Sequence, residues 1–202
     1  MKRPLLLAAM AIATSLVLSA PAAYADTITF TAMLSGALEV PSNASAGTGS
    51  ATVVLDTIAN TLFVDVVFSG LTGTTTASHI HCCVASPFLN ANAGVATQVP
   101  TFLNLPLGVT SGSFTQLLDL TLASSYNPAF ITAEGGTVPD AEAALVLGME
   151  DGESYLNIHT TSYPGGEIRG LLAETPEPGS ILLLGSGLVG LVCTRLKLAR
   201  KN

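Results

Sequence analysis

The three histidines of this chain lie in two short segments that both alternate like β-strands. In ASHIHCC, a strand would place His79 and His81 on one face and the intervening isoleucine on the other. In YLNIHTT, Asn157 and His159 share a face in the same way. Two imidazoles from an H-x-H pattern and a third from another strand form a chemically sensible ligand set for copper or zinc.

The residues after the third histidine indicate how these segments would meet. TSYPGG is a compact turn, so SYLNIHT and GEIRGLL are expected to form a hairpin. In the register that this turn favours, Glu167 lies across from His159, and Arg169 lies across from Asn157. A strand carrying the H-x-H pattern beside this hairpin would bring all three histidines together on its polar face.

Two interpretations of this polar face stay open. In the first, the face is a copper or zinc site, with Glu167 orienting one imidazole as a hydrogen-bond acceptor behind the ligands. In the second, the histidines are exposed and form hydrogen bonds to neighbouring Thr, Asn and Glu side chains. Arg169 is expected to form a structural ion pair, with Glu167 or Glu39 as its partner.

The cysteines follow the H-x-H pattern directly. Alternation sends Cys82 toward the core and Cys83 toward the histidines, where its sulfur would be a soft ligand favouring Cu(I). The pair either stays reduced and buried without a chemical role or forms a disulfide, between the two neighbours or to another chain. A thioredoxin-like role is disfavoured, because the spacing is C-C and not C-x-x-C. No Ser-His-Asp signature, phosphate loop or Rossmann pattern is visible, so no catalytic residue or organic cofactor is assigned.

Both ends of the chain have the pattern of targeting segments. At the N-terminus, two basic residues precede an apolar run that ends in the A-x-A site Ala23-Tyr24-Ala25. This pattern predicts a signal peptide over residues 1–25, with Asp26 as the first mature residue. The alternative is an uncleaved membrane anchor.

The C-terminal segment, residues 176–202, combines Pro176-Glu177-Pro178, a short hydrophobic helix and a basic tail. In this order the three parts resemble the PEP-CTERM sorting signal of Gram-negative bacteria. The resemblance implies recognition by an exosortase-type membrane protease, transient anchoring in the inner membrane, and release to the cell surface or into extracellular polysaccharide. The alternative is a plain single-pass anchor.

Charge narrows the possible partners of the mature domain. Residues 26–175 contain 13 of the 14 acidic residues, and Arg169 is their only basic residue among the seven of the chain. Such a surface repels phosphate backbones, which excludes nucleic-acid binding and disfavours anionic membrane surfaces. We therefore expect the protein to contact the membrane only through its terminal segments.

The residues between the two ends read as an all-β domain. Seven alternating stretches bounded by turn residues predict strands, with a hairpin turn at residues 57–60, and PDAEAALVLGMEDG predicts a short helix. A series of short strands with one or two short helices predicts a two-sheet antiparallel sandwich.

The quoted blocks FTAMLSGALEVPSNASAGTGSATVVLD, LFVDVVFSGLTGTTTASHIH and YLNIHTTSYPGGEIRGLL resemble successive parts of the CHRD domain, from Phe30 to Leu172. The resemblance implies a secreted, immunoglobulin-like β-domain over residues 26–175 and no established enzymatic activity. We therefore expect an exported, non-enzymatic surface or matrix protein associated with exopolysaccharide. The alternative is an extracellular copper- or zinc-binding module that uses His79, His81 and His159, with redox activity as one option.

Overall fold

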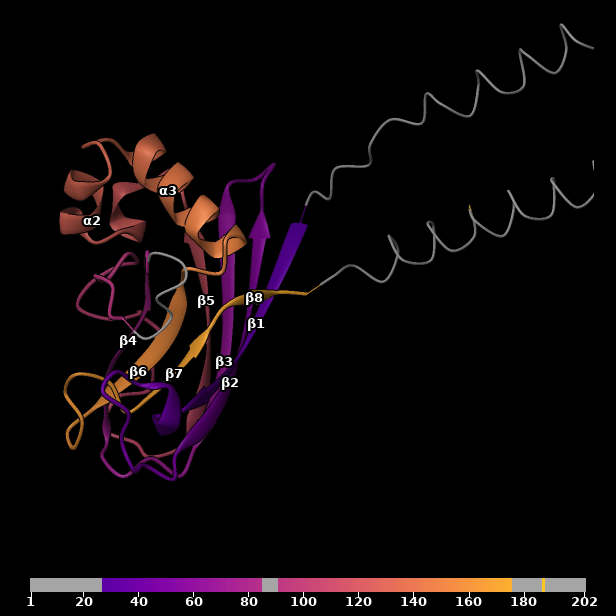
Figure 1. The fold of residues 1–202 in the computed structure, drawn as a ribbon. Coiled ribbons are helices and arrows are strands. Elements are labelled where there is room, and N and C mark those ends of the chain that lie inside the picture. The colour runs from indigo at the N-terminus through magenta and orange to yellow at the C-terminus, as the bar shows by residue number, and fades with distance from the viewer. Residues whose placement is uncertain (1–26, 85–90, 176–186, 188–202) are drawn as a thin grey trace, which may run out of the picture.

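A computed structural model describes residues 27–84 and 91–175, together with Gly187. The predicted signal peptide and the predicted C-terminal hydrophobic helix lie outside these residues. Within the described part, no helix is both long and apolar enough to cross a membrane. Figure 1 shows the fold, whose strands are β1 (Thr27–Ser35), β2 (Thr48–Asp56), β3 (Thr61–Ser69), β4 (Thr75–His81), β5 (Gly112–Asp119), β6 (Tyr155–Thr160), β7 (Ile168–Leu171) and β8 (Ala173–Glu174).

The strands form one antiparallel sheet in the order β4-β6-β7-β1-β2-β3-β5, and β8 pairs with β1. The all-β fold with few short helices is confirmed. The sheet differs from the predicted sandwich in one respect, because its two halves are hydrogen-bonded to each other and are not separate sheets. The junction is narrow: β1 and β7 share the single residue pair Ser35–Arg169, which lets the sheet curl.

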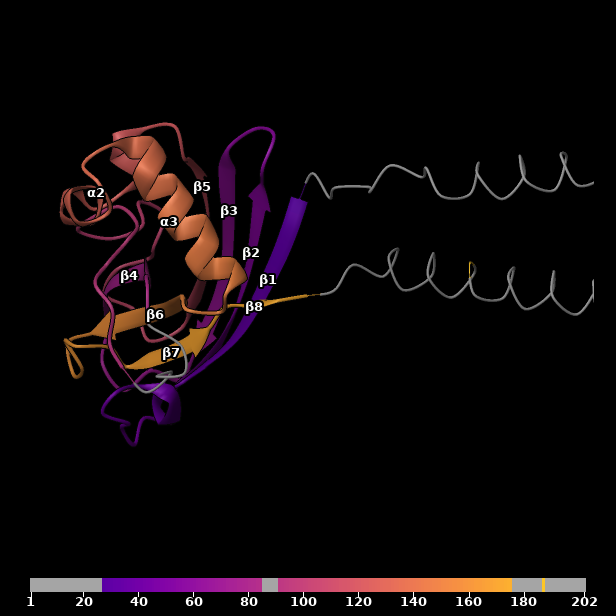
Figure 2. The same cartoon turned by 45° about the horizontal axis from the view of Figure 1, so that its top comes forward.

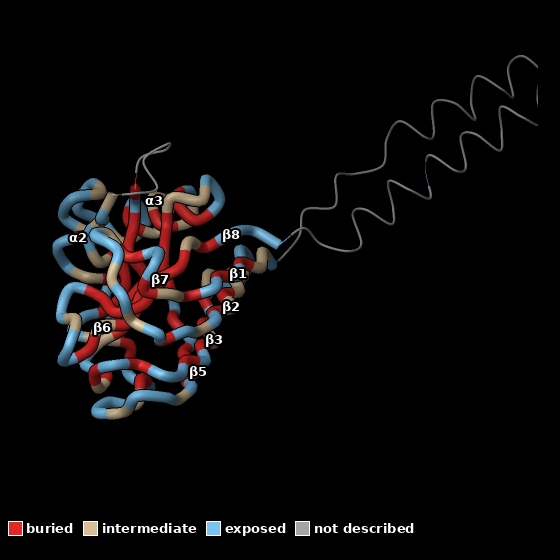
Figure 3. Tube along the Cα trace, turned by 60° about the horizontal axis from the view of Figure 1, so that its bottom comes forward, coloured by how far each residue is buried: buried red, intermediate tan, exposed pale blue. Residues whose placement is uncertain are grey.

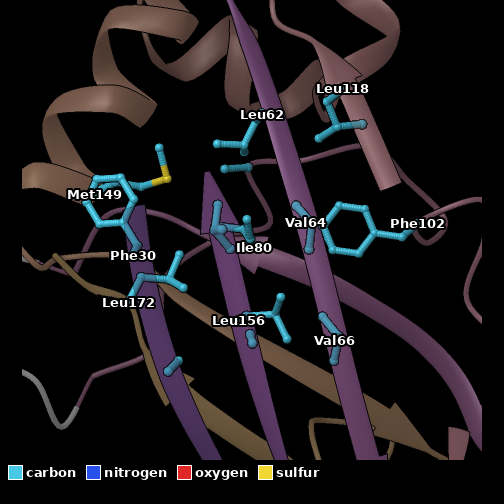
Figure 4. Packing of buried hydrophobic residues seen from close by; sticks show 14 of the residues in the cluster. Phe30, Leu62, Val64, Val66, Ile80, Phe102, Leu118, Met149, Leu156 and Leu172 are labelled. Carbon is cyan, nitrogen blue, oxygen red and sulfur yellow. The ribbon is translucent and has the colours of Figure 1, made fainter. Parts of the chain in front are cut away.

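The alternation seen in the sequence places the core between the two halves of the curled sheet. Ile80 of β4 and Leu156 of β6 pack among the same buried cluster as Val64 and Val66 of β3 (Figure 4). All four side chains are fully buried. The apolar positions of both halves therefore share one core, and the opposite face of β4, β6 and β7 is left for polar side chains.

The predicted helix is α3 (Val138–Glu150), and α2 (Pro128–Ala133) precedes it. Thr137 caps α3 by accepting a hydrogen bond from the backbone N–H of Asp140, which satisfies one free donor of the first turn. Ala141, Leu145 and Met149 recur every four residues and are fully buried. Figure 2 shows α3 beside the sheet, and Figure 4 shows Met149 packed in the core.

Both predicted hairpins are present. Residues 57–60 turn between β2 and β3, which pair from Asp56–Thr61 onward. β6 and β7 pair with Asn157 opposite Arg169, as the sequence predicts. Figure 3 shows that these two strands run through the buried part of the domain, although they carry several of its polar side chains.

Candidate metal centre

The pairing of β4 with β6 brings the three histidines together. In this register Ala77 lies opposite His159, His79 opposite Asn157, and His81 opposite Tyr155. Because side chains alternate across a strand, all of them occupy the polar face of the sheet. One ring nitrogen from each histidine lies within 4.8 Å of one from each of the others. The predicted meeting of the histidines is therefore confirmed.

The histidines are covered, although the sequence suggested that they face outward. β4 is an edge strand, and the chain after it runs back along this edge, with Val95 bridged to His81. Only 6% of the His79 surface and 7% of the His81 surface are exposed. Deep burial removes the water that would otherwise hydrogen-bond to the rings, so each ring nitrogen needs a partner from the protein or from a ligand.

Backbone carbonyls fix one nitrogen of each ring. His79 Nε2 lies 2.7 Å from the carbonyl oxygen of Pro100, and His81 Nδ1 lies 2.9 Å from that of Ala93. His159 Nδ1 lies 2.9 Å from the carbonyl oxygen of Pro164 in the β6–β7 turn. A carbonyl oxygen only accepts, so each of these nitrogens must carry the proton and donate it. The other nitrogen of each neutral ring then holds a lone pair.

These lone-pair nitrogens are buried, and among the described residues none of them has a hydrogen-bond partner. They are His79 Nδ1, His81 Nε2 and His159 Nε2, and the Oδ1 atom of Asn157 is in the same condition. Asn157 is 2% exposed and lies between the histidines, opposite His79 and two residues before His159 on the same face. Within the described part of the chain, four buried acceptors without a hydrogen bond thus lie in one covered patch, an arrangement that proteins otherwise avoid. The Asn157 side chain lies near enough to the His81 ring to raise its pKa, although less than burial lowers it.

Burial keeps the imidazoles neutral. Loss of water lowers the pKa of His79 and of His81 to about 4, and the hydrogen bonds to Pro100 and Ala93 offset only part of this effect. Burial also lowers the pKa of His159. All three rings are therefore in the form that binds a metal ion at neutral pH, and binding would displace no proton from them.

A tyrosine and an arginine border the histidines. The ring of Tyr155 stacks on His81, with centroids 4.8 Å apart and an interplanar angle of 7°. The Arg169 guanidinium lies 4.5 Å from the centroid of the Tyr155 ring and donates to the backbone oxygen of Leu38. It also donates to Asn92 Oδ1 at 3.0 Å. This places a fixed positive charge beside the histidines.

Glu167 does not orient an imidazole, which corrects the prediction for this residue. Its carboxylate accepts hydrogen bonds from Ser45 Oγ, Thr160 Oγ1 and the backbone N–H groups of Thr72 and Gly73. Burial alone would raise the pKa of Glu167, but these four donors hold it below its ordinary value. Backbone carbonyls perform the orienting role instead.

The predicted pair of Glu167 with Arg169 is not among the hydrogen bonds described for either side chain. Glu39, the other predicted partner of Arg169, lies close enough to the guanidinium for its charge to act on the carboxyl. Burial raises the pKa of Glu39 to about 7, and the charge of Arg169 partly opposes this rise. The Oε1 atom of Glu39 is buried and has no hydrogen-bond partner in the part of the chain that the structure describes.

Cys83 is not brought to the histidines. It forms a disulfide with Cys82, the second of the two outcomes expected from the sequence. Cys82 is buried, as predicted, whereas Cys83 is exposed. Both sulfurs lie against α3, where a Cβ on Gly148 would collide with them. The structure therefore assigns the cysteines to the contact between β4 and this helix, and leaves three imidazoles as the nitrogen and sulfur donors of the described cluster.

Sequence reasoning missed the groups that orient the rings. The carbonyls of Ala93, Pro100 and Pro164 belong to loops, and any residue type could supply a carbonyl there, so no sequence signal identifies them. Tyr155 had a signal, because it precedes Asn157 by two residues and therefore shares its face.

Comparison with protein families gives two matches. Residues 30–172 match the CHRD domain, and residues 174–198 match the PEP-CTERM protein-sorting motif. No curated protein and no solved structure matches the chain. The sorting motif implies recognition by an exosortase-type system, export, and transient membrane anchoring through the C-terminal segment.

Proposed function

The chain belongs to the CHRD domain family and carries a PEP-CTERM sorting motif, and from this premise we propose that it is an exported protein that binds one copper or zinc ion. The ligands are His79 Nδ1, His81 Nε2 and His159 Nε2. The ion would give the domain a binding role outside the cytoplasm, and no catalytic step is assigned to it.

The observation that carries this proposal is the set of buried lone pairs without partners. Leaving a buried acceptor unsatisfied costs about 1–3 kcal/mol, and three ring nitrogens share this condition in one cluster. One cation would satisfy all of them at once. The opposite nitrogen of each ring already donates to a backbone carbonyl, which is the usual way in which proteins orient metal-binding histidines.

The choice of copper or zinc follows from the donor set. Neutral imidazoles suit both ions, whereas magnesium and calcium prefer several oxygen ligands. Among the described residues, the metal-binding group contains no carboxylate and no sulfur.

Metal analysis of the full chain tests the proposal. All three histidines of the protein belong to the cluster, so the chain must be purified without a histidine tag. We expect one equivalent of Zn²⁺ or Cu²⁺ to remain bound after gel filtration. His81→Ala should lower the affinity at least 100-fold, because one of three ligands is lost. Asp65→Asn, on the exposed face of β3, controls for weak cation binding to the acidic surface and should leave the affinity unchanged. Binding that is equal in His81→Ala, or absent from the natural chain, would contradict the proposal.

We also propose that the protein ends at the cell surface or in the extracellular matrix, associated with exopolysaccharide. The support is the sorting motif at residues 174–198 and the near absence of basic residues from the domain. Deletion of residues 176–202 should abolish surface retention in the native host, measured by fractionation and immunodetection. Unchanged retention of the truncated chain would contradict this destination.

A further inference from the structure

A pocket adjoins the histidine cluster. Its volume is about 450 Å³, and His79 and His159 line it directly. The remaining wall is made by Thr76, Ala77, Val95, Thr160, Thr161 and Pro164, from β4, β6 and the neighbouring loops. The pocket thus offers a path from the surface to the side of the cluster formed by these two histidines.

Within the described residues, the ligand group itself supplies no negative charge to balance a divalent ion. The three imidazoles are neutral, and Asn157, the other buried acceptor among them, is an uncharged amide. The Glu167 carboxylate is engaged by donors from Ser45 and the segment around Thr72. Within the described residues, the group that would hold the ion contains histidines alone.

The Arg169 guanidinium, a fixed charge that borders the cluster, has the same sign as the ion, and burial raises the pKa of the Glu39 carboxyl beside it to about 7. The Arg169 guanidinium packs on Tyr155, which in turn stacks on His81, and its charge is felt at the His81 ring. A buried cation without a counter-charge is unfavourable, and charges attract more strongly where water is excluded. A small anion beside the ion would relieve this imbalance. Three imidazoles also leave at least one coordination position of Zn²⁺ or Cu²⁺ unfilled.

We propose that the bound divalent ion takes a small monodentate anion as an exchangeable fourth ligand, and that this anion enters through the pocket between His79 and His159. The inference rests on the proposed metal-binding function. The pocket wall contributes the methyl groups of Ala77 and Val95 and the ring of Pro164 near the histidines, so a compact anion fits better than an extended one.

Azide is a suitable probe, because its binding to Cu²⁺ produces a charge-transfer absorption band. The untagged full chain is first loaded with one equivalent of Cu²⁺ and then titrated with sodium azide. We expect a saturable band with one azide per copper. If the chain takes up no copper, the loading step itself shows that the proposed function fails, and the inference fails with it. If copper is bound but azide produces no band, the inference alone is overturned.

Two variants test the pocket and the charge separately. Ala77→Leu places bulk in the pocket opposite His159 and should weaken azide binding at least tenfold while copper stays bound. Asn157→Asp supplies the missing negative charge and should also weaken azide binding at least tenfold, with copper held at least as tightly. Azide affinity that is unchanged in the copper-loaded variants would overturn the inference, and if Ala77→Leu folds poorly, Asn157→Asp decides alone.

Discussion

Two regions on the outer face of the curled sheet, one over each half, differ in how far their side chains are buried. On the outer face of β1, β2, β3 and β5, large apolar side chains are exposed, with Met33 at 74% and Leu117 at 60%. On the outward face of β4, β6 and β7, polar side chains are buried, with Asn157 at 2% and Arg169 at 3%. Strand alternation holds in both regions, with one register irregularity between Thr75 and Ala77 of β4.

The difference lies in what covers each face. Loops bend over the histidine face and supply the carbonyls that its rings need, whereas the face around Phe63 and Val67 is open to water. Exposed apolar side chains are common on proteins, but a buried polar atom without a partner is rare. The covered face therefore carries information about function that the open face does not.

The largest effect is expected from placing a charge in the covered patch around the histidines. His79→Lys puts an unpaired ammonium in the covered patch and should destabilise the metal-free protein by about 3 kcal/mol or more. Urea denaturation measures this loss. A loss below about 1 kcal/mol would mean that water reaches the patch and that the two faces are alike.

The second largest effect is expected at the Glu167 carboxylate, which binds donors from Ser45 and from the segment of Thr72 and Gly73. Glu167→Gln presents an amide N–H₂ group to donors and should cost about 2–3 kcal/mol, because hydrogen bonds to a charged acceptor are lost. The matched control, Glu174→Gln, changes an exposed carboxylate and should shift the unfolding free energy by less than about 0.5 kcal/mol. Equal losses in the two variants would refute the role of Glu167.

The end of β4 provides a third contrast. Gly148→Ala directs a methyl group into the sulfurs of Cys82 and Cys83 and should destabilise the protein by about 2 kcal/mol through overpacking. Leu147→Ala, next to it on the exposed side of α3, is the control and should change stability little. Thermal unfolding of the two variants measures the difference in their stability, and equal losses would contradict the close contact at Gly148.

The covered face should also show in the pH dependence of the metal-free protein. Folded His79 and His81, with pKa values of about 4, stay neutral down to that pH, whereas in the unfolded chain they take up protons near pH 6.5. Glu39 acts in the opposite direction. Its folded pKa is about 7, so it already carries a proton in the folded chain at pH 5.5, whereas in the unfolded chain it takes one up only near pH 4.5.

Because burial also lowers the pKa of His159, the unfolded chain binds at least one more proton than the folded chain, and stability should fall by at least about 1.4 kcal/mol per pH unit as the pH drops through 5.5. Denaturation at pH 6.0 and 5.0 measures this slope. Glu39→Gln removes the offset and should make the slope steeper. A flat profile between these two pH values would show that the histidines are not desolvated.

The smallest effect is expected on the open face. Val67→Lys places the same charge as His79→Lys at a position that is 53% exposed, and it should change stability by less than about 0.5 kcal/mol. A loss comparable to that of His79→Lys would show that the open face is covered in solution, for example by a second copy of the chain.

Much of the fold could be predicted because it depends on local patterns. The alternation of β2 and β3, the turn at residues 57–60 and the apolar spacing of α3 were all visible in the sequence. The pairing that joins the two halves of the sheet was not visible in the sequence. It joins Ser35 to Arg169, residues far apart in the chain, and no short-range pattern encodes such a contact.

The candidate site divides in the same way. The alternation of His79 and His81 and the register of Asn157 with Arg169 predicted the meeting of the histidines. Their burial could not be predicted, because it comes from loops that fold over an edge strand. The hydrogen-bond partners of the Glu167 side chain could not be predicted from the sequence either, since they come from the segments around Ser45 and Thr72.

X-ray absorption of the zinc-loaded full chain reports which atoms are bound to the ion. We expect three imidazole nitrogens at about 2.0–2.1 Å from zinc, and no sulfur at about 2.3 Å. Fewer than three imidazoles, or a sulfur in the first coordination sphere, would contradict a site built from His79, His81 and His159.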